Sequence, residues 1–244
     1  MPYKTTNLYS PNFDNTKRLK KNIKFIIIHY TGMRSESEAI QRLNDTKSKV
    51  SCHYFIKKNG DLINMVPDYY SSWHAGKSSW KKYKLLNKNS IGIEISNQGH
   101  DYEYKFFEKK QMTTLISILK KIVKKYKIKK ENILGHSDIA PDRKRDPGEK
   151  FNWQLLAKKK LCIWPNLDPI KIRKYRGINL EKNKIDEFYK NLLKIGYCKI
   201  FNVKKNRTIK ILTIAFQRRF RQELVNGIID LETFLISKNL VNKQ

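Results

Sequence analysis

The residues best suited to chemistry are two histidines and an aspartate. His29 closes the apolar run "FIIIHY", His136 follows "NILG", and Asp146 lies ten residues further on, in "RDPG". Two imidazoles and one carboxylate suit Zn²⁺, and three protein ligands leave a fourth position for water, as in catalytic zinc sites. A bound zinc lowers the pKa of that water from about 15.7 to about 7, which makes it a nucleophile at neutral pH.

Each histidine also has a simpler interpretation, a hydrogen-bonded histidine in the core or at its rim, which we favour for either one taken alone. Glu94 changes this balance because its carboxylate is embedded in the apolar run "SIGIEIS". Charged groups are rarely buried without a partner. A buried glutamate beside an activated water can act as general base. The alternative for Glu94 is a strand-edge side chain that faces solvent.

Short strands are predicted to position these residues. The segments 23–31 and 90–96 are β-branched apolar runs typical of buried strands, and a third short strand covers 131–136. In a mixed α/β sheet, side chains at the carboxyl ends of strands face the ligand crevice. We therefore expect His29 and His136 to reach that crevice. The proline after Asp146 keeps the aspartate backbone extended, so the turn can direct its carboxylate back toward the strand ends.

The remaining pattern predicts an α/β fold, with a mixed central β-sheet flanked by helices, plus a small C-terminal helical domain. Helices are expected at 35–45, 106–126 and 152–161, a hairpin around "KNGD" at 51–66, and a loop at 67–89. The stretch "GHSDIAPDRKRDPGEKF" has no apolar period and is predicted to be neither an ordinary helix nor a strand. The C-terminal helical segments are 185–195, 208–222 and 231–240.

Composition limits the possible partners. The chain has 244 residues and a net charge of +30, with lysine dispersed along its length. Such charge attracts polyanions, but solvated lysine on every surface is the favoured interpretation. A specific nucleic-acid partner is not expected, because the sequence has no known nucleic-acid motif and no basic face interleaved with aromatic residues. No apolar run is long enough for a transmembrane segment. Three distant cysteines predict buried free thiols.

The ordered motifs "FIIIHYTG", "CHYFI", "WHAG", "NSIGIEISNQG" and "GHSDIAPDRKRDPGEKF" resemble the zinc-dependent N-acetylmuramoyl-L-alanine amidases of the type-2 family. This family includes the peptidoglycan-recognition proteins. The resemblance implies a catalytic domain at 23–165, which follows a polar arm at 1–22. A stretch with two prolines and no clear period predicts a linker at 166–180, before the helical domain at 181–244. In that domain, "TIAFQRRFRQELVNGIIDLET" resembles a peptidoglycan-binding helical module, and the alternative is a helical cap that stabilises the catalytic domain. The loop "KIFNVKKNRTIK" departs from the usual glycine-containing turn of that module.

The resemblance also implies residue roles. One Zn²⁺ per chain would be held by His29, His136 and Asp146, with Glu94 as catalytic acid/base and Lys144 as the cation that stabilises the oxyanion. By composition alone, Lys144 is one more solvated lysine. His74 and Asn97 match substrate-groove positions, and local loop hydrogen bonding is their alternative. His53 is expected in the second layer or the core, and His100 on the surface. Asp138, Asp142, Arg143 and Arg145 are expected to tie the loop down or lie in solvent.

The implied reaction is hydrolysis of the amide between N-acetylmuramic acid and L-alanine in peptidoglycan or muropeptides. The alternative is a non-catalytic peptidoglycan-recognition protein, which a complete ligand set with Glu94 disfavours. The wall-binding-like module favours the cell envelope or periplasm. The N-terminus lacks the apolar region of a signal peptide, which leaves the cytoplasm as the alternative compartment.

Overall fold

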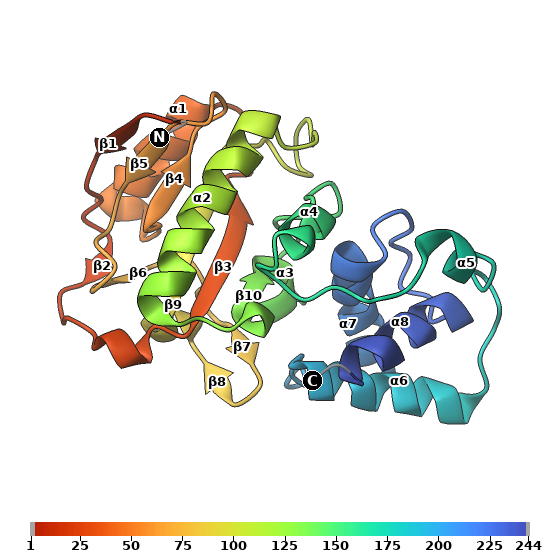
Figure 1. The fold of residues 1–244 in the computed structure, drawn as a ribbon. Coiled ribbons are helices and arrows are strands. Elements are labelled where there is room, and N and C mark those ends of the chain that lie inside the picture. The colour runs from red at the N-terminus through yellow and green to blue at the C-terminus, as the bar shows by residue number, and fades with distance from the viewer. Residues whose placement is uncertain (1–2, 243–244) are drawn as a thin grey trace.

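The computed structural model describes residues 3–242 and contains a six-stranded mixed sheet (Figure 1). The strands β4 and β5 are antiparallel and all other neighbours are parallel. This arrangement confirms the predicted α/β fold with a mixed central sheet. In order across the sheet, the strands are β1 (Thr5–Asn7), β5 (Leu62–Asn64), β4 (Tyr54–Ile56), β9 (Ser90–Ile95), β3 (Phe25–Tyr30) and β10 (Ile133–Gly135).

Alternation along β3 gives the sheet two different faces. Ile26 and Ile28 point to one face and pack in a core with α2 (Lys109–Tyr126), which lies across the sheet (Figure 1). Phe25 and Ile27 point to the other face and pack with the C-terminal helices. His29 continues this second series, so its side chain lies on the face opposite α2.

The predicted helices and hairpin of the first half are present. The helix α1 (Glu36–Asn44) begins where the Ser35 side chain accepts a hydrogen bond from Glu38 N. The turn between β4 and β5 is closed by a hydrogen bond from Lys57 N to Asp61 O. The predicted loop at 67–89 contains short strands, of which β6 pairs with β2 and β7 pairs with β8. Their bounds are β2 (Phe13–Asp14), β6 (Ser71–Ser72), β7 (Ser79–Trp80) and β8 (Tyr83–Lys84).

The C-terminal third is helical and lies beyond β10, at the opposite edge of the sheet from β1 (Figure 1). Its helices are α4 (Trp153–Lys158), α5 (Pro169–Arg173), α6 (Lys182–Ile195), α7 (Lys205–Phe220) and α8 (Leu231–Val241). The helix α5 falls within the predicted linker and was not anticipated. Asp168 caps it, accepting from Ile170 N and Lys171 N, and Pro169 occupies its first turn.

Two segments differ from the sequence-based expectation. The stretch 135–151 is mostly irregular, as predicted, but it contains the four-residue helix α3 (His136–Ile139), which follows β10 directly and was not anticipated. The carboxylate of Asp138 accepts from Gly135 N and so stabilises this single turn. The predicted N-terminal arm includes β1, whose residues pair in register with β5 at the sheet edge.

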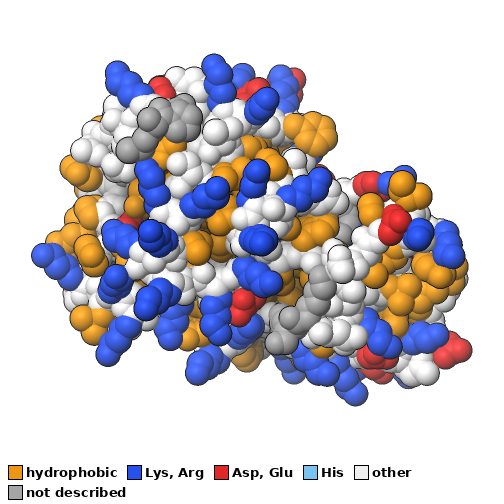
Figure 2. Space-filling view, viewed as in Figure 1, with side chains coloured by type: hydrophobic (Ala, Val, Ile, Leu, Met, Phe, Trp, Pro, Cys, Tyr) orange, Lys and Arg blue, Asp and Glu red, His pale blue; other side chains and the backbone are white. Residues whose placement is uncertain are grey.

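Positive charge is spread over the surface rather than gathered in one arm. Figure 2 shows lysine and arginine side chains scattered over the visible face of the sheet region and of the helical region. Among residues 3–242, no helix has both the length and the apolar character needed to cross a bilayer. All three cysteines are free thiols, with Cys52 and Cys162 buried as predicted and Cys198 only partly buried.

Candidate active site

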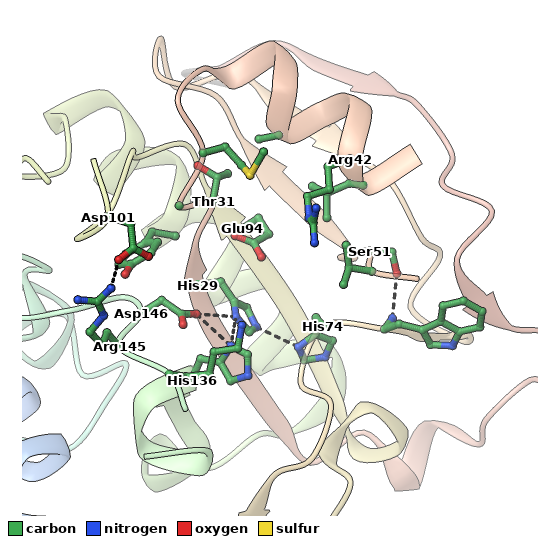
Figure 3. Close-up of a pocket in the computed structure, with 18 of the residues that line it drawn as sticks. His29, Thr31, Arg42, Ser51, His74, Glu94, Asp101, His136, Arg145 and Asp146 are labelled. Carbon is green, nitrogen blue, oxygen red and sulfur yellow. Dashed lines mark hydrogen bonds and ion pairs between the residues drawn. The ribbon is translucent and has the colours of Figure 1, made fainter. Parts of the chain in front are cut away.

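The register of the two central strands places a histidine beside a carboxylate. In the parallel pair β3–β9, His29 is the Cα partner of Glu94. Both side chains therefore project from the same face, the one that α2 does not cover. Figure 3 shows Glu94 and His29 directed into one cavity.

The loop after β10 brings two further groups to His29. Its Nδ1 lies 3.0 Å from Nδ1 of His136 and 2.9 Å from Oδ2 of Asp146, and the last two atoms are 3.1 Å apart. A backbone hydrogen bond of 2.8 Å from Ser137 N to Asp146 O ties the two loop residues together. The predicted ligand trio is thus assembled from β3, α3 and the loop that follows α3 (Figure 3).

These three residues fit a small cation with tetrahedral coordination. All three residues are buried, and their donor atoms lie within 4.8 Å of one another. Zinc–ligand distances of roughly 2.0–2.1 Å place tetrahedral ligand atoms about 3.3 Å apart, close to the separations found here. Burial lowers the pKa of His29 to about 4, so its ring stays neutral and able to bind a metal. Although burial opposes ionisation of Asp146, His136 and His29 hold the pKa of its carboxyl below its usual range.

A second layer of side chains orients the two imidazoles. Nε2 of His29 lies 3.0 Å from Nδ1 of His74, whose Nε2 lies 3.0 Å from Ser90 Oγ. The ring of His74 packs against Gly92, where a Cβ atom would lie 2.4 Å from His74 Cγ. On the other side, Nε2 of His136 lies 3.3 Å from the carbonyl oxygen of Ala75.

The cavity beside the trio has a volume of about 290 Å³. Glu94 and Lys144 both line it, together with Arg42, Trp73 and Arg143. Burial raises the pKa of Glu94 well above its usual value, and Asp146 raises it further. Within residues 3–242, Oε2 of Glu94 is buried without a hydrogen-bond partner. A carboxylate with one buried, unused oxygen at the wall of a cavity is suited to exchanging a proton with a bound molecule.

Two residues expected in the substrate groove have other contacts. The His74 ring lines the cavity but is hydrogen-bonded to His29 and Ser90, behind the metal-binding atoms. Asn97 lies in a neighbouring groove, where its Nδ2 donates to Lys105 O and its Oδ1 accepts from Gly99 N. These contacts match the local loop hydrogen bonding that was the alternative for Asn97.

For the two other histidines, the structure agrees with one prediction and contradicts the other. His53 is fully buried and bonded to Ser72, as expected for a second-layer or core residue. The prediction that His100 is exposed is wrong, because its side chain is 14% exposed and its Nε2 pairs with Glu149 at 3.1 Å. Its Nδ1 also lies 2.9 Å from the Tyr30 hydroxyl.

The charged residues of the loop tie it down, as expected. Arg143 donates to the backbone oxygens of Ala75 and Lys77, and Arg145 pairs with Asp101 on the surface. Asp142 is exposed and Asp138 is fully buried. The supporting roles of Ser90 and Gly92 were missed, although a glycine inside a buried strand signals the close approach of another group.

Comparison with known proteins agrees with this geometry. A family described as N-acetylmuramoyl-L-alanine amidase, Amidase_2, matches residues 19–149. The N-acetylmuramoyl-L-alanine amidase AmiD of Escherichia coli is 35% identical over 238 residues, covering 91% of this chain and 83% of AmiD. The 1,6-anhydro-N-acetylmuramyl-L-alanine amidase AmpD of Haemophilus influenzae is 31% identical over 167 residues, covering 60% of this chain and 87% of AmpD.

Solved structures extend the similarity to the C-terminal helices. E. coli AmiD, in complex with the substrate anhydro-N-acetylmuramic acid-L-Ala-D-γ-Glu-L-Lys, matches with a TM-score of 0.80 and 33% identity, covering 94% of this chain and 93% of its own. AmpDh3 of Pseudomonas aeruginosa matches with a TM-score of 0.79 and 29% identity, over 97% and 98% of the two chains. The chain therefore belongs to the Amidase_2 family of N-acetylmuramoyl-L-alanine amidases.

Proposed function

We propose that this chain uses one zinc ion to hydrolyse the amide between N-acetylmuramic acid and L-alanine, in peptidoglycan or in its soluble fragments. The observation that carries the proposal is the convergence of His29, His136 and Asp146 on one point, in a cavity that is also lined by Glu94, whose Oε2 has no hydrogen-bond partner. Zinc, when bound, would polarise the amide carbonyl and lower the pKa of a water molecule. The complete set of donors and Glu94 favour an enzyme over a non-catalytic recognition protein.

The hydrogen bonds around the imidazoles support their use as neutral ligands. With Nδ1 of His29 as the donor to the metal, its Nε2 carries the proton and donates to Nδ1 of His74. His74 then donates from Nε2 to Ser90 Oγ, which donates to Leu86 O. Such outer partners fix the tautomer and the orientation of a ligand ring. We therefore assign His74 to orienting His29 rather than to contacting substrate.

Glu94 and Lys144 carry the remaining chemistry in this proposal. Glu94 takes a proton from the water as it attacks the amide carbon, and returns it to the nitrogen as the carbon–nitrogen bond breaks. The products are a free muramic acid carboxylate and a peptide with a free L-alanine amino group. Lys144 lines the same cavity, where its charge adds to the effect of burial in lowering the pKa of His29 and offsets part of the burial-driven rise in the pKa of Glu94. Its ammonium is suited to stabilising the negative charge that develops on the amide oxygen.

The proposed organisation keeps a catalytic domain at 23–165 after an arm at 1–22, with a linker at 166–180 and a helical domain at 181–244. The structures of AmiD and AmpDh3 cover the helical part, whereas a structure of AmpD covers 66% of this chain and 95% of its own. A wall-binding module raises the local concentration of an enzyme on polymeric substrate. We therefore propose that the chain acts on wall material in the cell envelope.

Mass spectrometry of digests tests the proposed function. The purified chain is incubated with anhydro-muropeptides and with intact sacculi, with and without a chelator. We expect release of peptides that begin with L-alanine, loss of this release in chelator, and its recovery when Zn²⁺ is added back. The matched variant Asp146→Ala should lose both zinc and activity. Full zinc content in Asp146→Ala, measured by elemental analysis, would show that the ligand assignment is wrong.

A further inference from the structure

The C-terminal helical domain reaches the loop that carries two of the proposed metal ligands. We infer that Tyr197, Arg219 and Gln222 form a clamp that sets the positions of His136 and Asp146. The helical domain would then be part of the catalytic unit, in addition to any role in binding the wall. This inference rests on the proposed function for its metal, and its structural part is testable without that function.

The first half of the clamp surrounds Asp138. Nη1 of Arg219 lies 2.5 Å from Oδ2 of Asp138, and the Tyr197 hydroxyl donates to Oδ1 at 2.7 Å. The side chains of Arg219 and Asp138 are only 2% and 1% exposed. A second donor of Arg219, Nη2, bonds to Ile133 O in β10 at 3.0 Å. The guanidinium also lies 4.3 Å from the centroid of the Trp153 ring.

The contacts of Asp138 with Arg219 and Tyr197 also fix the backbone at His136. Oδ2 of Asp138 also accepts from Gly135 N at 2.8 Å, so one carboxylate closes the turn from Gly135 to Asp138. His136 lies inside that turn, as the first residue of α3. The orientation of its backbone is therefore set by a carboxylate whose other partners, Arg219 and Tyr197, come from the helical domain.

The second half of the clamp holds the far end of the loop. Nε2 of Gln222 donates to Glu149 O at 2.7 Å and to Phe151 O at 2.6 Å. Arg219 and Gln222, at the end of α7 and just beyond it, therefore bind the loop on both sides of Asp146. The hydrogen bond from Ser137 N to Asp146 O connects the two ends.

The chain contains a matched ion pair that does not touch this loop. Nη1 of Arg221 lies 2.5 Å from Oδ2 of Asp230, and both side chains are as deeply buried as Arg219 and Asp138. The side chain of Arg221 bonds to Leu224, Asn226, Asp230 and Glu232, all within the helical domain. Breaking either buried pair leaves an uncompensated charge and destabilises the fold. Breaking the Arg219–Asp138 pair should also change the loop that carries His136 and Asp146, whereas breaking the Arg221–Asp230 pair should not.

The experiment compares Asp138→Asn and Arg219→Met with Asp230→Asn and Arg221→Met, all in the full chain. Zinc affinity is measured by competition with a chelator, and thermal unfolding by calorimetry. Loss of partners that orient a metal ligand typically weakens metal binding about 10- to 100-fold. We expect this loss in the first two variants, with a lower kcat and a KM close to wild type. The control pair should lose thermal stability and keep zinc affinity and kcat.

Hydrogen exchange of the segment 135–151, followed by mass spectrometry, gives a readout that does not depend on activity or zinc. Exchange in this segment should accelerate in the Asp138 and Arg219 variants and not in the controls. Equal zinc affinity and equal exchange in both pairs, at matched losses of stability, would overturn the inference. If the Arg219 variant does not fold, Tyr197→Phe replaces it, because this change removes only one hydroxyl. Tyr197→Phe should show weaker zinc binding and faster exchange at 135–151, both to a smaller degree. Wild-type zinc affinity and exchange in Tyr197→Phe would overturn the inference. A wild-type chain without amidase activity counts against the proposed function, whereas the exchange comparison still decides on the clamp.

Discussion

Replacing Gly92 by alanine tests the arrangement behind His29. An added Cβ would lie 2.4 Å from His74 Cγ and 2.7 Å from both Cδ2 and Nδ1 of that ring. Favourable contacts between carbon atoms lie at about 3.5–4.0 Å, so the ring must move by roughly 1 Å. Such a shift stretches the 3.0 Å contact between His74 Nδ1 and His29 Nε2 beyond hydrogen-bond distance.

Two effects of known size follow from this displacement. Overpacking of a buried site costs about 1–3 kcal/mol of folding free energy. At about 2–4 °C per kcal/mol for a chain of this size, Gly92→Ala should lower Tm by roughly 2–12 °C. Loss of the partner that orients His29 should weaken zinc binding by about 10- to 100-fold.

The assay is calorimetry of the chelator-treated protein, combined with a chelator titration of the zinc form. The matched control is the same substitution in a His74→Ala background. There the added Cβ meets no ring, so Gly92→Ala should change Tm little, and the two substitutions should be coupled by about 0.5–3 kcal/mol. If Gly92→Ala keeps wild-type Tm and zinc affinity, or lowers Tm equally in both backgrounds, the proposed packing of His74 is incorrect.

Two further predictions concern the catalytic groups. The variant Lys144→Ala should have a kcat about 10²- to 10³-fold lower than wild type, because the ammonium stabilises the negative charge that develops on the amide oxygen. Its zinc content, measured by elemental analysis, should be unchanged. A wild-type kcat would show that Lys144 has no part in the mechanism. Burial raises the folded-state pKa of Glu94 above its usual 4.5, so the stability of the metal-free protein falls as pH rises above that value. Glu94→Gln lacks this titration and should have a higher Tm than wild type at pH 8, in chelator, with the difference gone at pH 4. A difference independent of pH would contradict the raised pKa.

Local sequence patterns were sufficient to predict the strands β3, β9 and β10 and the polar groups on them, but not the short strands in the arm and in the loop 67–89. The apolar runs that end at His29 and contain Glu94 specify buried strands, and the parallel register of β3 and β9 then brings the two side chains together. The sequence does not contain that register as a local signal. The resemblance of the motif "WHAG" to the amidase family suggested a role for His74 in the substrate groove, but only the three-dimensional contacts show that its ring faces His29.

Contacts between distant segments explain what the sequence could not predict. Asp138 and Arg219 are separated by 81 residues, and neither lies in a pattern that points to the other. In sequence, Asp138 is one charge in a charged loop, and Arg219 is one cation in a chain with 52 lysines and arginines. The burial of His100 likewise depends on Glu149 and Tyr30, which lie in other segments.

The short strand β1 has a consequence for how the protein behaves in solution. Thr5–Asn7 pair with β5, and hydrogen bonds from Leu8 N to Asn64 O and from Ser10 N to Met65 O continue the contact. Without this segment, β5 would present open backbone N–H and C=O groups, which are a template for pairing with other chains. The residues of β1, which lie far from the candidate active site, would therefore protect the enzyme from aggregation. Their removal should reduce solubility before it reduces activity.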